Sequence, residues 1–322
     1  MLNKDSAYVR SVRGQVSTED LGFTHCHEHI WIEKGRSFEI NSVLCIDSMK
    51  CSEAELSGFK KVGGGTIVDA QPVGCGRNAV KLKELSERSG VNIIASTGFH
   101  KLIYYPRSHW IYEMSQSELT DLFANELVKG MHLLSDIELS YGHCDATAGI
   151  IKTAFDDKFD SEYYKKLFGA AVNAAKECKA PVMVHIDNGT DPLKLARWFE
   201  TEGMELTKLI FCHMDRAVPD LNVHEVIARC GIFLEYDTVA RYKYHDDGHE
   251  VKLIMEMIER GFADNILMGL DTTRLRLSAY GGAPGLTFLK QNFVPYLTGQ
   301  GASESDIDKI FFQNPKRALK EN

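Results

Sequence analysis

Eight short runs of apolar and β-branched residues recur along the chain, and each is bounded by glycine, proline or polar residues. They cover residues 23–30, 66–71, 92–98, 148–155, 181–187, 208–215, 231–238 and 266–273. Most of these runs are continuously apolar and end in a polar residue, as in AGIIKTAF or KLIFCHMD. Parallel strands that are buried on both faces have this pattern, so we predict eight strands of one parallel sheet.

Between the predicted strands lie longer segments whose apolar residues recur at helical spacing. The clearest helices are expected at 77–90, 161–179, 191–203, 251–261 and 303–319. In the third of these, Asp191 is the expected N-cap, Pro192 takes the first helical position and Gly203 ends the helix. Eight alternations of strand and helix predict right-handed crossovers and a closed (β/α)8 barrel.

An open, doubly wound sheet is the competing α/β fold for the same alternation. Such sheets usually carry a glycine-rich phosphate-binding turn after the first strand, and none follows residues 23–30 here. The GGGT segment at 63–66 precedes a strand instead of opening a helix, so it does not qualify. We therefore expect a TIM barrel that forms a single domain over residues 1–322, with its active site at the C-terminal ends of the strands.

Composition narrows the partners and the compartment. The chain has 322 residues, of which 44% are hydrophobic and 25% are charged, and its formal net charge is -8. An acidic chain is a poor match for nucleic acid or for an anionic membrane, so we expect a small-molecule substrate instead. The eight cysteines form no C-x-x-C pair, and neither a signal peptide nor a membrane-spanning run is visible. These features favour free thiols and a cytoplasmic location.

Polar side chains gather where the predicted strands end, which in a TIM barrel is the catalytic face. The candidates are His27, His29, Lys152, His185, His213 and Asp271. Each alone has an ordinary structural explanation, but four imidazoles and a carboxylate together are a ligand set for zinc or a similar divalent metal. Because five such ligands exceed what one catalytic zinc takes, the set indicates two metals.

The segment GFTHCHEHIW places His25, His27 and His29 at every second position. Alternate residues of a strand face the same side, so the three imidazoles are predicted to share one face. Since the site lies at the carboxyl end of the strand, His27 and His29 are the expected ligand pair. His25 is expected one layer deeper, as a core histidine or as a support for the ligands.

These segments resemble the phosphotriesterase and lactonase branch of the amidohydrolase superfamily. The resembling segments are GFTHCHEHI, the stretch at 63–99, AGIIK, PVMVHID, LIFCHMD, ILMGLD and the closing FFQNPKRAL, in the family's order. The resemblance implies the same (β/α)8 barrel and a hydrolase with two divalent metal ions. Zinc is the metal that it favours, with manganese and cobalt as alternatives.

The resemblance also assigns the metal ligands. One metal would take the histidine pair of the first strand with Asp271, and the other would take His185 and His213. Lys152, carboxylated by CO2, would bridge both metals, because a carbamate offers two anionic oxygens whereas an ammonium group cannot ligate a cation. In such sites metal-bound hydroxide attacks the substrate, and the aspartate passes the proton to the leaving oxygen. Asp271 and Lys152 are thus the implied catalytic residues.

The chain departs from that family in the loops that form the pocket. After the third strand the phosphotriesterase and quorum-lactonase branches usually carry Trp or Tyr, and this chain has His100. The last two loops add Lys243, Arg274 and Tyr280. Arginine and lysine suit an anionic substrate better than a neutral triester or a long acyl chain. Because this cluster resembles family members that open phosphorylated sugar lactones, we expect these four residues to bind the substrate.

The first hypothesis is therefore a dinuclear metal-dependent lactonase that opens a polar, phosphorylated sugar lactone. The alternative is a phosphoric ester hydrolase, for a triester or a diester, that uses the same site. A third hypothesis, an inactive barrel kept for binding or assembly, conflicts with the complete set of metal ligands. We also expect the protein to form a homo-oligomer, namely a dimer.

Overall fold

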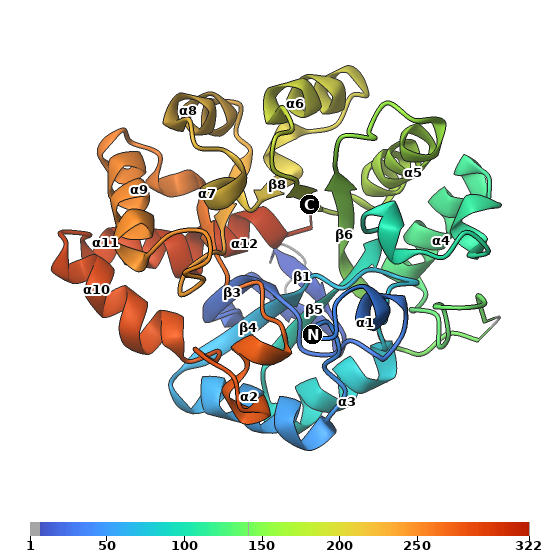
Figure 1. Cartoon of the computed structure of the whole chain (residues 1–322), viewed down its shortest axis with the longest axis horizontal. Helices are drawn as coiled ribbons and strands as arrows, with labels where there is room; N and C mark the ends of the chain where they lie inside the picture. Colours follow the sequence, from blue (N-terminus) through green and yellow to red (C-terminus); the bar gives the residue numbers. More distant parts are fainter. Residues whose placement is uncertain (1–6, 141, 322) are drawn as a thin grey trace.

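The computed structural model describes residues 7–140 and 142–321 and contains an eight-stranded parallel sheet that curls into a nearly closed barrel (Figure 1). In sheet order the strands are β3 (Phe23–Glu28), β4 (Gly64–Asp69), β5 (Asn92–Gly98), β6 (Ala148–Phe155), β7 (Val182–Ile186), β8 (Leu209–Cys212), β9 (Phe233–Tyr236) and β10 (Ile266–Met268). Each coincides with one of the eight predicted runs. The predicted TIM barrel is confirmed.

The first and last strands meet just beyond the end of β10. The backbone N–H groups of Leu270 and Asp271 donate to the carbonyl oxygen of His27 at 3.3 and 3.0 Å. These bonds close the ring of strands, because β3 and β10 are the two ends of the sheet order. They also bring the residues that follow β10 next to the histidine-rich end of β3.

Helices surround the barrel, and most of them form an outer ring in Figure 1. They are α1 (Arg36–Ile40), α2 (Met49–Lys61), α3 (Ala79–Ser89), α4 (Gln116–Val128), α5 (Glu162–Cys178), α6 (Pro192–Thr201), α7 (Met214–Ala217), α8 (Leu221–Arg229), α9 (Asp247–Glu259), α10 (Val294–Gly299), α11 (Glu304–Asp308) and α12 (Asn314–Leu319). The five predicted helices are all present, and a π-helical turn joins α11 to α12. No described helix is both long enough and apolar enough to cross a membrane.

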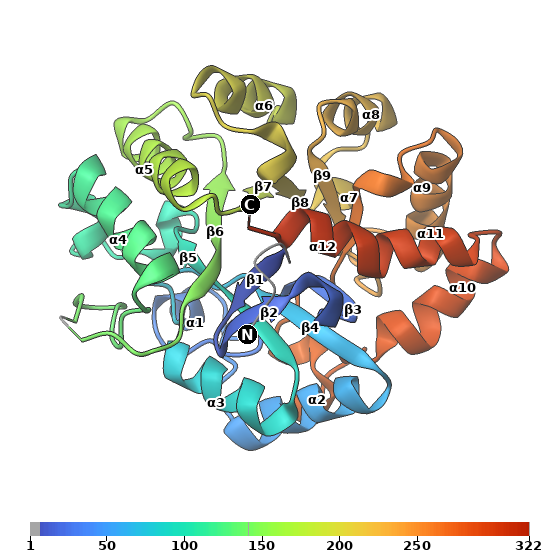
Figure 2. The ribbon, with the colours of Figure 1, turned by 180° about the vertical axis from the view of Figure 1, so that it is seen from behind.

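A hairpin that the sequence did not predict covers the amino end of the barrel. Its strands β1 (Tyr8–Ser11) and β2 (Gly14–Ser17) lie over the barrel end in the reverse view (Figure 2). Val9 of this hairpin packs into the core inside the barrel together with Leu319 of the last helix. Gly149 of β6 lies so close to the carbonyl of Arg10 that no side chain would fit there. The site can therefore open only at the opposite end.

A buried ion pair ties the third strand to the helices outside it. Arg77 donates to both carboxylate oxygens of Glu126 at 2.7 and 2.6 Å, and to the carbonyl of Ser96 at 2.8 Å. Both charged side chains are fully buried. Removing one partner would leave the other charge buried without compensation, which is one of the most destabilising changes known in proteins.

We expect Arg77→Ala to lower the free energy of unfolding by about 3–5 kcal/mol. Arg88→Ala is the matched control, because Arg88 pairs with Glu84 on the surface, and it should cost less than about 1 kcal/mol. Denaturant unfolding of both variants measures the difference. Equal losses in the two variants would contradict the assigned role of the buried pair.

Candidate active site

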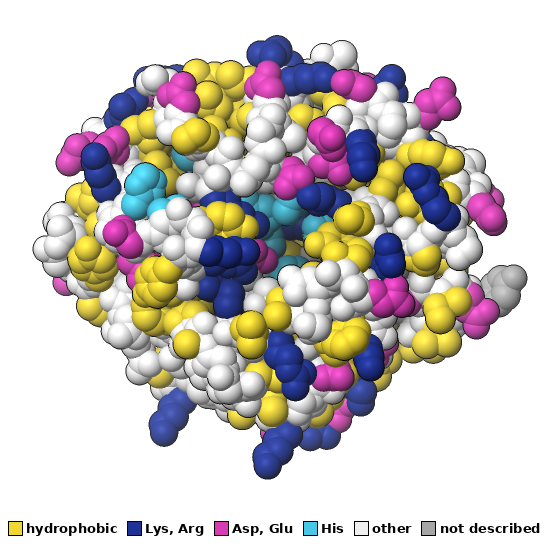
Figure 3. Space-filling model, in the orientation of Figure 1, with side chains coloured by type: hydrophobic (Ala, Val, Ile, Leu, Met, Phe, Trp, Pro, Cys, Tyr) yellow, Lys and Arg dark blue, Asp and Glu magenta, His cyan; other side chains and the backbone are white. Residues whose placement is uncertain are grey.

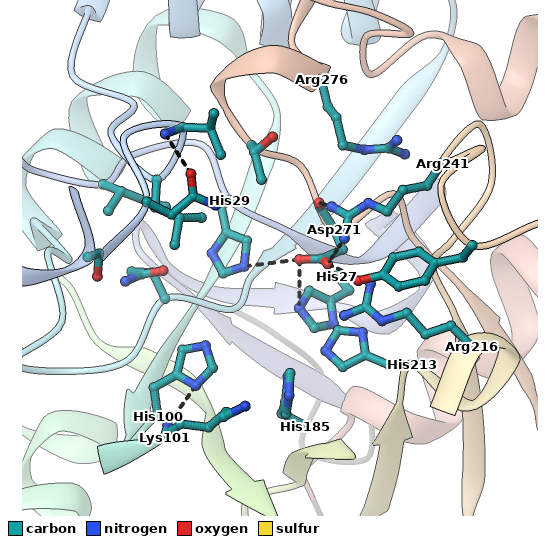
Figure 4. Close-up of a pocket in the computed structure, with 18 of the residues that line it drawn as sticks. His27, His29, His100, Lys101, His185, His213, Arg216, Arg241, Asp271 and Arg276 are labelled. Carbon is teal, nitrogen blue, oxygen red and sulfur yellow. Dashed lines mark hydrogen bonds and ion pairs between the residues drawn. The ribbon is translucent and has the colours of Figure 1, made fainter. Parts of the chain in front are cut away.

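All six predicted metal ligands come together at the carboxyl end of the barrel (Figure 4). They line a cavity of about 640 Å3 that is open to solvent. His27, His185 and Lys152 belong to strands β3, β7 and β6. His29 and His213 directly follow β3 and β8, and Asp271 lies three residues beyond β10. The barrel geometry thus gathers residues that are up to 244 positions apart, which is the arrangement that the strand ends predicted.

One carboxylate oxygen faces two imidazoles. Asp271 Oδ1 lies 3.5 Å from His29 Nε2 and 3.8 Å from His27 Nε2. The three ligand atoms lie within 4.8 Å of one another, which is the spacing of groups that can share one metal ion. The imidazole of His213 lies beside this group and beside His185, at ring-centroid distances of 4.9 Å from His27 and 4.4 Å from His185.

Lys152 ends in the middle of these side chains. It is 1% exposed, and its Nζ lies 3.5 Å from His27 Nε2 and 3.9 Å from Cys212 Sγ. Among the described residues, no carboxylate lies within ion-pairing distance of this amine. A buried ammonium group without a carboxylate partner is costly, whereas a carbamate on the same nitrogen would suit a position between cations. The surroundings of Lys152 therefore fit the modification that the family resemblance implies.

Two buried carboxylates lie behind the imidazoles, and Glu235 forms a hydrogen bond with His27. Glu235 Oε2 lies 2.8 Å from His27 Nδ1, and Asp237 Oδ2 lies 2.6 Å from His213 Nδ1. Carboxylates in this position favour a proton on Nδ1, so that Nε2 keeps its lone pair for a metal. The sequence analysis singled out neither Glu235 nor Asp237 as a candidate. The signal was their alternation in LEYD, which turns both side chains to one face of β9.

Burial also keeps the imidazoles neutral. It lowers the pKa of His185 to about 4, and it lowers the pKa values of His27 and His213 well below the usual value. The positive charge of Lys152 adds to the effect on His27. An unprotonated imidazole can donate its lone pair, so the histidines are in the state that metal binding requires.

Two of the candidate ligands sit in a strained backbone conformation. His213 and Asp271 have φ values of +63° and +47°, in the left-handed region that favours glycine. Such strain costs about 1–3 kcal/mol per residue and is maintained only where the surrounding structure imposes it. The kink lies directly after β8 at His213 and three residues after β10 at Asp271, and in both cases the side chain lines the cavity.

The structure corrects one expectation for the histidine-rich strand. His25 pairs with Ile67 and Glu28 with Asp69, so β3 uses three residue steps where β4 uses two. This bulge breaks the period of two, and the three histidines do not share a face. His25 instead packs against Phe59 of α2, at a ring-centroid distance of 4.7 Å, outside the barrel. It is a core histidine as expected, but it is not one layer below His27.

His25 nevertheless reaches the site through its neighbour Glu28. His25 Nδ1 lies 2.7 Å from Glu28 Oε1. The same carboxylate accepts hydrogen bonds from the backbone of Leu270 at 2.9 Å and of Thr272 at 3.3 Å. Glu28 therefore binds the backbone on both sides of Asp271 and fixes the orientation of the Asp271 carboxylate.

Two arginines that the sequence analysis did not single out hold the other oxygen of Asp271. Asp271 Oδ2 lies 2.7 Å from an Nη1 of Arg241 and 3.1 Å from Arg216 Nη1 (Figure 4). Burial alone would raise the pKa of Asp271, but the charge of Arg241 and the contact with His29 hold it well below its usual value. Asp271 thus stays ionised, which is the form that can bind a cation.

The four predicted substrate-binding residues divide into two pairs. His100 and Lys243 line the cavity. Arg274 and Tyr280 do not, because the turn after β10 directs Arg274 outward to Asp47, 3.1 Å away, and over the ring of Tyr280. The Tyr280 hydroxyl bonds to the backbone of Ser48 instead. The structure therefore does not support the expected role of these two residues, and it gives the cavity Arg276 from the same turn.

Residues of the loop after β5 complete the cavity wall. Lys101 and Tyr104 line it next to His100, and Lys101 Nζ makes a 2.5 Å ion pair with Asp187. The rings of His100 and His185 are 5.4 Å apart, so His100 lies directly beside a candidate metal ligand. Sequence reasoning anticipated that this long connection forms part of the site, but it selected only His100.

A (β/α)8 barrel with buried histidines and an aspartate gathered at its carboxyl end defines a hydrolase of the amidohydrolase type. The chain belongs to the phosphotriesterase family, whose sequence profile matches residues 7–319. The predicted family and the assignment as an enzyme are confirmed.

Relatives of the chain span nearly its whole length. It is 27% identical to the N-acetyltaurine hydrolase of Danio rerio, over 97% of each chain. It is 28% identical to the phospho-furanose lactonase of Mycoplasmopsis synoviae (strain 53), over 98% of this chain and 92% of the relative. The crystal structure of an amidohydrolase from Mycoplasma synoviae matches with a TM-score of 0.94 at 28% identity, over 99% of this chain and 93% of that chain.

We expect Glu28→Gln to weaken metal binding by about 10–100-fold, as is usual when a group that orients a ligand is lost. The amide would present a donor to backbone N–H groups and release the turn that carries Asp271. Metal titration of the apoprotein by calorimetry measures the effect. Glu39→Gln, at an exposed glutamate, is the control and should bind metal like the parent. Unchanged affinity in Glu28→Gln would contradict the positioning role.

Proposed function

We propose that the protein is a dinuclear metal-dependent hydrolase that opens a polar, phosphorylated sugar lactone. The observation that carries this proposal is the convergence of the six candidate ligands on one cavity. One metal would be held by His27, His29 and Asp271, and the other by the histidine pair of β7 and β8. A carboxylated Lys152 would be shared between them. When bound, two divalent metals supply an activated water nucleophile and polarise the carbonyl oxygen of the substrate.

The protein's own residues would then transfer the proton and hold the transferring carboxylate in position. Asp271 is ionised and faces the cavity, so it can accept a proton from the attacking water and pass it to the leaving ring oxygen. Arg216 and Arg241 hold its second oxygen and would keep it aligned during that transfer. Both guanidinium groups also face the cavity, where they would stabilise negative charge on the departing oxygen.

The charge of the cavity supports an anionic substrate. Figure 3 shows dark blue lysine and arginine side chains around the central hollow, with histidines at its floor. Arg216, Arg241, Lys243 and Arg276 line it. Arg276 donates to backbone carbonyls and Arg241 to Asp271. The amine of Lys243 lies over the ring of Tyr244 and forms no side-chain hydrogen bond or ion pair with the described residues. Lys243 is therefore the cation that we assign to the phosphate of the substrate.

Two relatives support the same substrate shape. One acts on a phospho-furanose lactone and the other on N-acetyltaurine. Each of these compounds has a carbonyl group to be hydrolysed and a tetrahedral anion, phosphate or sulfonate, at its other end. An anion fixed away from the reacting carbon would orient the substrate, so that its binding energy contributes to catalysis.

Other reactions remain candidates for the same site. Hydrolysis of an N-acyl amide that carries a sulfonate is favoured by the Danio rerio relative. Hydrolysis of a phosphoric triester or diester is the alternative that the sequence analysis put forward. Zinc as the resident metal, with manganese or cobalt as alternatives, also belongs to the proposal. We also propose that residues 1–322 form a single domain, that the protein is a homodimer and that it is located in the cytoplasm.

Purified protein should hold at least two divalent ions per chain, and His27→Ala and His185→Ala should lose metal and activity together. These substitutions remove one ligand from each proposed metal, and a missing ligand lowers affinity steeply. Metal analysis by mass spectrometry measures the content. His249→Ala, at an exposed histidine, should keep both ions. A fully active enzyme with one ion or fewer per chain would contradict the dinuclear site.

Lys243→Ala should lower kcat/KM for a phosphorylated sugar lactone by about 1.5–3 kcal/mol in transition-state terms, the usual value of a hydrogen bond to a charged group. Turnover of the same lactone without its phosphate should change far less. Arg274→Ala is the control, because Arg274 points away from the cavity to Asp47, and it should leave both rates near those of the parent. A parent enzyme that prefers the unphosphorylated lactone would contradict the anion-binding role.

A further inference from the structure

We infer that Asp215, His245 and Glu250 form a further cation site, separate from the proposed dinuclear centre. Their ligand atoms all lie within 4.8 Å of one another. Asp215 comes from α7, His245 from the loop before α9, and Glu250 from α9, two helices that lie side by side in Figures 1 and 2. None of the three lines the cavity that holds the other ligands.

The surroundings of Glu250 are the main evidence for a bound cation. Glu250 is fully buried, and neither of its carboxylate oxygens has a hydrogen-bond partner among the described residues. His245 Nε2 lies 3.3 Å from Glu250 Oε2. A buried carboxylate that lacks donors is strongly unfavourable unless a cation or a proton compensates it.

The two carboxylate oxygens of Asp215 differ in their hydrogen bonds to the described residues. Asp215 Oδ2 accepts hydrogen bonds from the backbone of Asp237 at 2.9 Å and of Thr238 at 2.6 Å. Those two bonds fix the side chain against the end of β9. Asp215 Oδ1 is buried and has no hydrogen-bond partner among the residues that the structure describes. It is thus a fixed oxygen that can still ligate.

The histidine presents a lone pair to these carboxylates. His245 Nδ1 lies 3.1 Å from the carbonyl oxygen of Asp246, so Nδ1 carries the proton in the neutral ring. Nε2 is then unprotonated and faces Glu250. A lone pair directed at a carboxylate is repulsive, and a cation between them would convert the repulsion into ligation.

Neither carboxylate has another positive partner. The nearest arginine in sequence, Arg216, directs its guanidinium to Asp237 and Asp271 instead. In the described part of the chain, no lysine or arginine nitrogen lies within ion-pairing distance of Asp215 or Glu250. Two carboxylate ligands and one imidazole are a suitable set for a divalent transition metal such as Mn2+ or Zn2+. Because the side chain of His245 is 12% exposed, the ion can enter from solvent.

Occupation of this site would stabilise one wall of the substrate cavity. Asp215, bonded to the backbone at 237 and 238, and Glu250 lie on either side of the loop that carries Arg241 and Lys243. A cation that joins α7 to α9 would therefore hold both ends of this loop. The inference itself does not depend on the proposed reaction, since it rests only on the three side chains.

Anomalous diffraction from crystals of the full chain grown with MnCl2 tests the site. We expect a manganese peak within coordination distance of Asp215 Oδ1, His245 Nε2 and Glu250, in addition to any peaks at His27 or His185. Manganese at the dinuclear centre, with the Asp215 and Glu250 oxygens in direct hydrogen-bond contact and no peak between them, would overturn the proposal. A proton shared between the two carboxylates would then explain why Asp215 and Glu250 lie close together.

A second measurement gives the stoichiometry in solution. Manganese titration followed by electron paramagnetic resonance should show one ion per chain fewer in Glu250→Gln than in the parent. Glu259→Gln, at an exposed glutamate of the same helix, should keep the parent's count. His245→Ala, at the partly exposed ligand, should also lose one ion, and it serves if Glu250→Gln does not fold. An unchanged count in a folded ligand variant would overturn the proposal.

Discussion

The hydrogen bonds from the end of β10 to the carbonyl of His27 are the constraint on which the rest of the site depends. They join the first strand of the barrel to the last, which are 238 or more residues apart in the chain. With Glu28 holding the backbone on both sides of Asp271, they set this carboxylate opposite the two imidazoles of β3. Strain at Asp271 is tolerated because these contacts determine its conformation.

The centre of the site contains carboxylates and neutral imidazoles, and its positively charged groups lie toward the cavity. Glu235, Asp237 and Asp271 surround neutral imidazoles, while Arg216 and Arg241 lie on the cavity side of the aspartates. The described residues thus put anionic and lone-pair groups inward and guanidinium groups toward the substrate. This separation suits metal cations below and an anionic substrate above, because each then meets charge of the opposite sign.

Much of this arrangement follows from residue patterns. Each strand is an apolar run, and in a barrel the polar residues near the carboxyl ends of the strands gather at one mouth, so all six candidate ligands were predictable. Two features were not. The bulge in β3 inserts one residue between His25 and Glu28, and nothing in GFTHCHEHIW distinguishes it from a regular strand. The outward turn of Arg274 depends on an ion pair with Asp47, which is more than 200 residues away in the chain.

Several helices in the long connections were not predicted, because tertiary contacts place polar residues on their buried faces. The buried face of α2 carries Ser52 and Glu55 beside its apolar residues, because the glutamate binds the backbone of the turn after β10. Its helical period is therefore weak in a plain apolar pattern. The same holds for the arginines of the cavity: their positions in the loops were visible, but which of them faces inward is decided by tertiary contacts.

The proposed dinuclear centre depends on Lys152 as a bridge between two metals. A high-resolution crystal structure of the protein prepared with zinc and bicarbonate tests this most directly. We predict density that continues beyond Lys152 Nζ into a planar carboxylate group lying between two anomalous peaks, one beside His29 and Asp271 and one beside His185 and His213. Density that ends at a bare amine in the metal-loaded protein would contradict it.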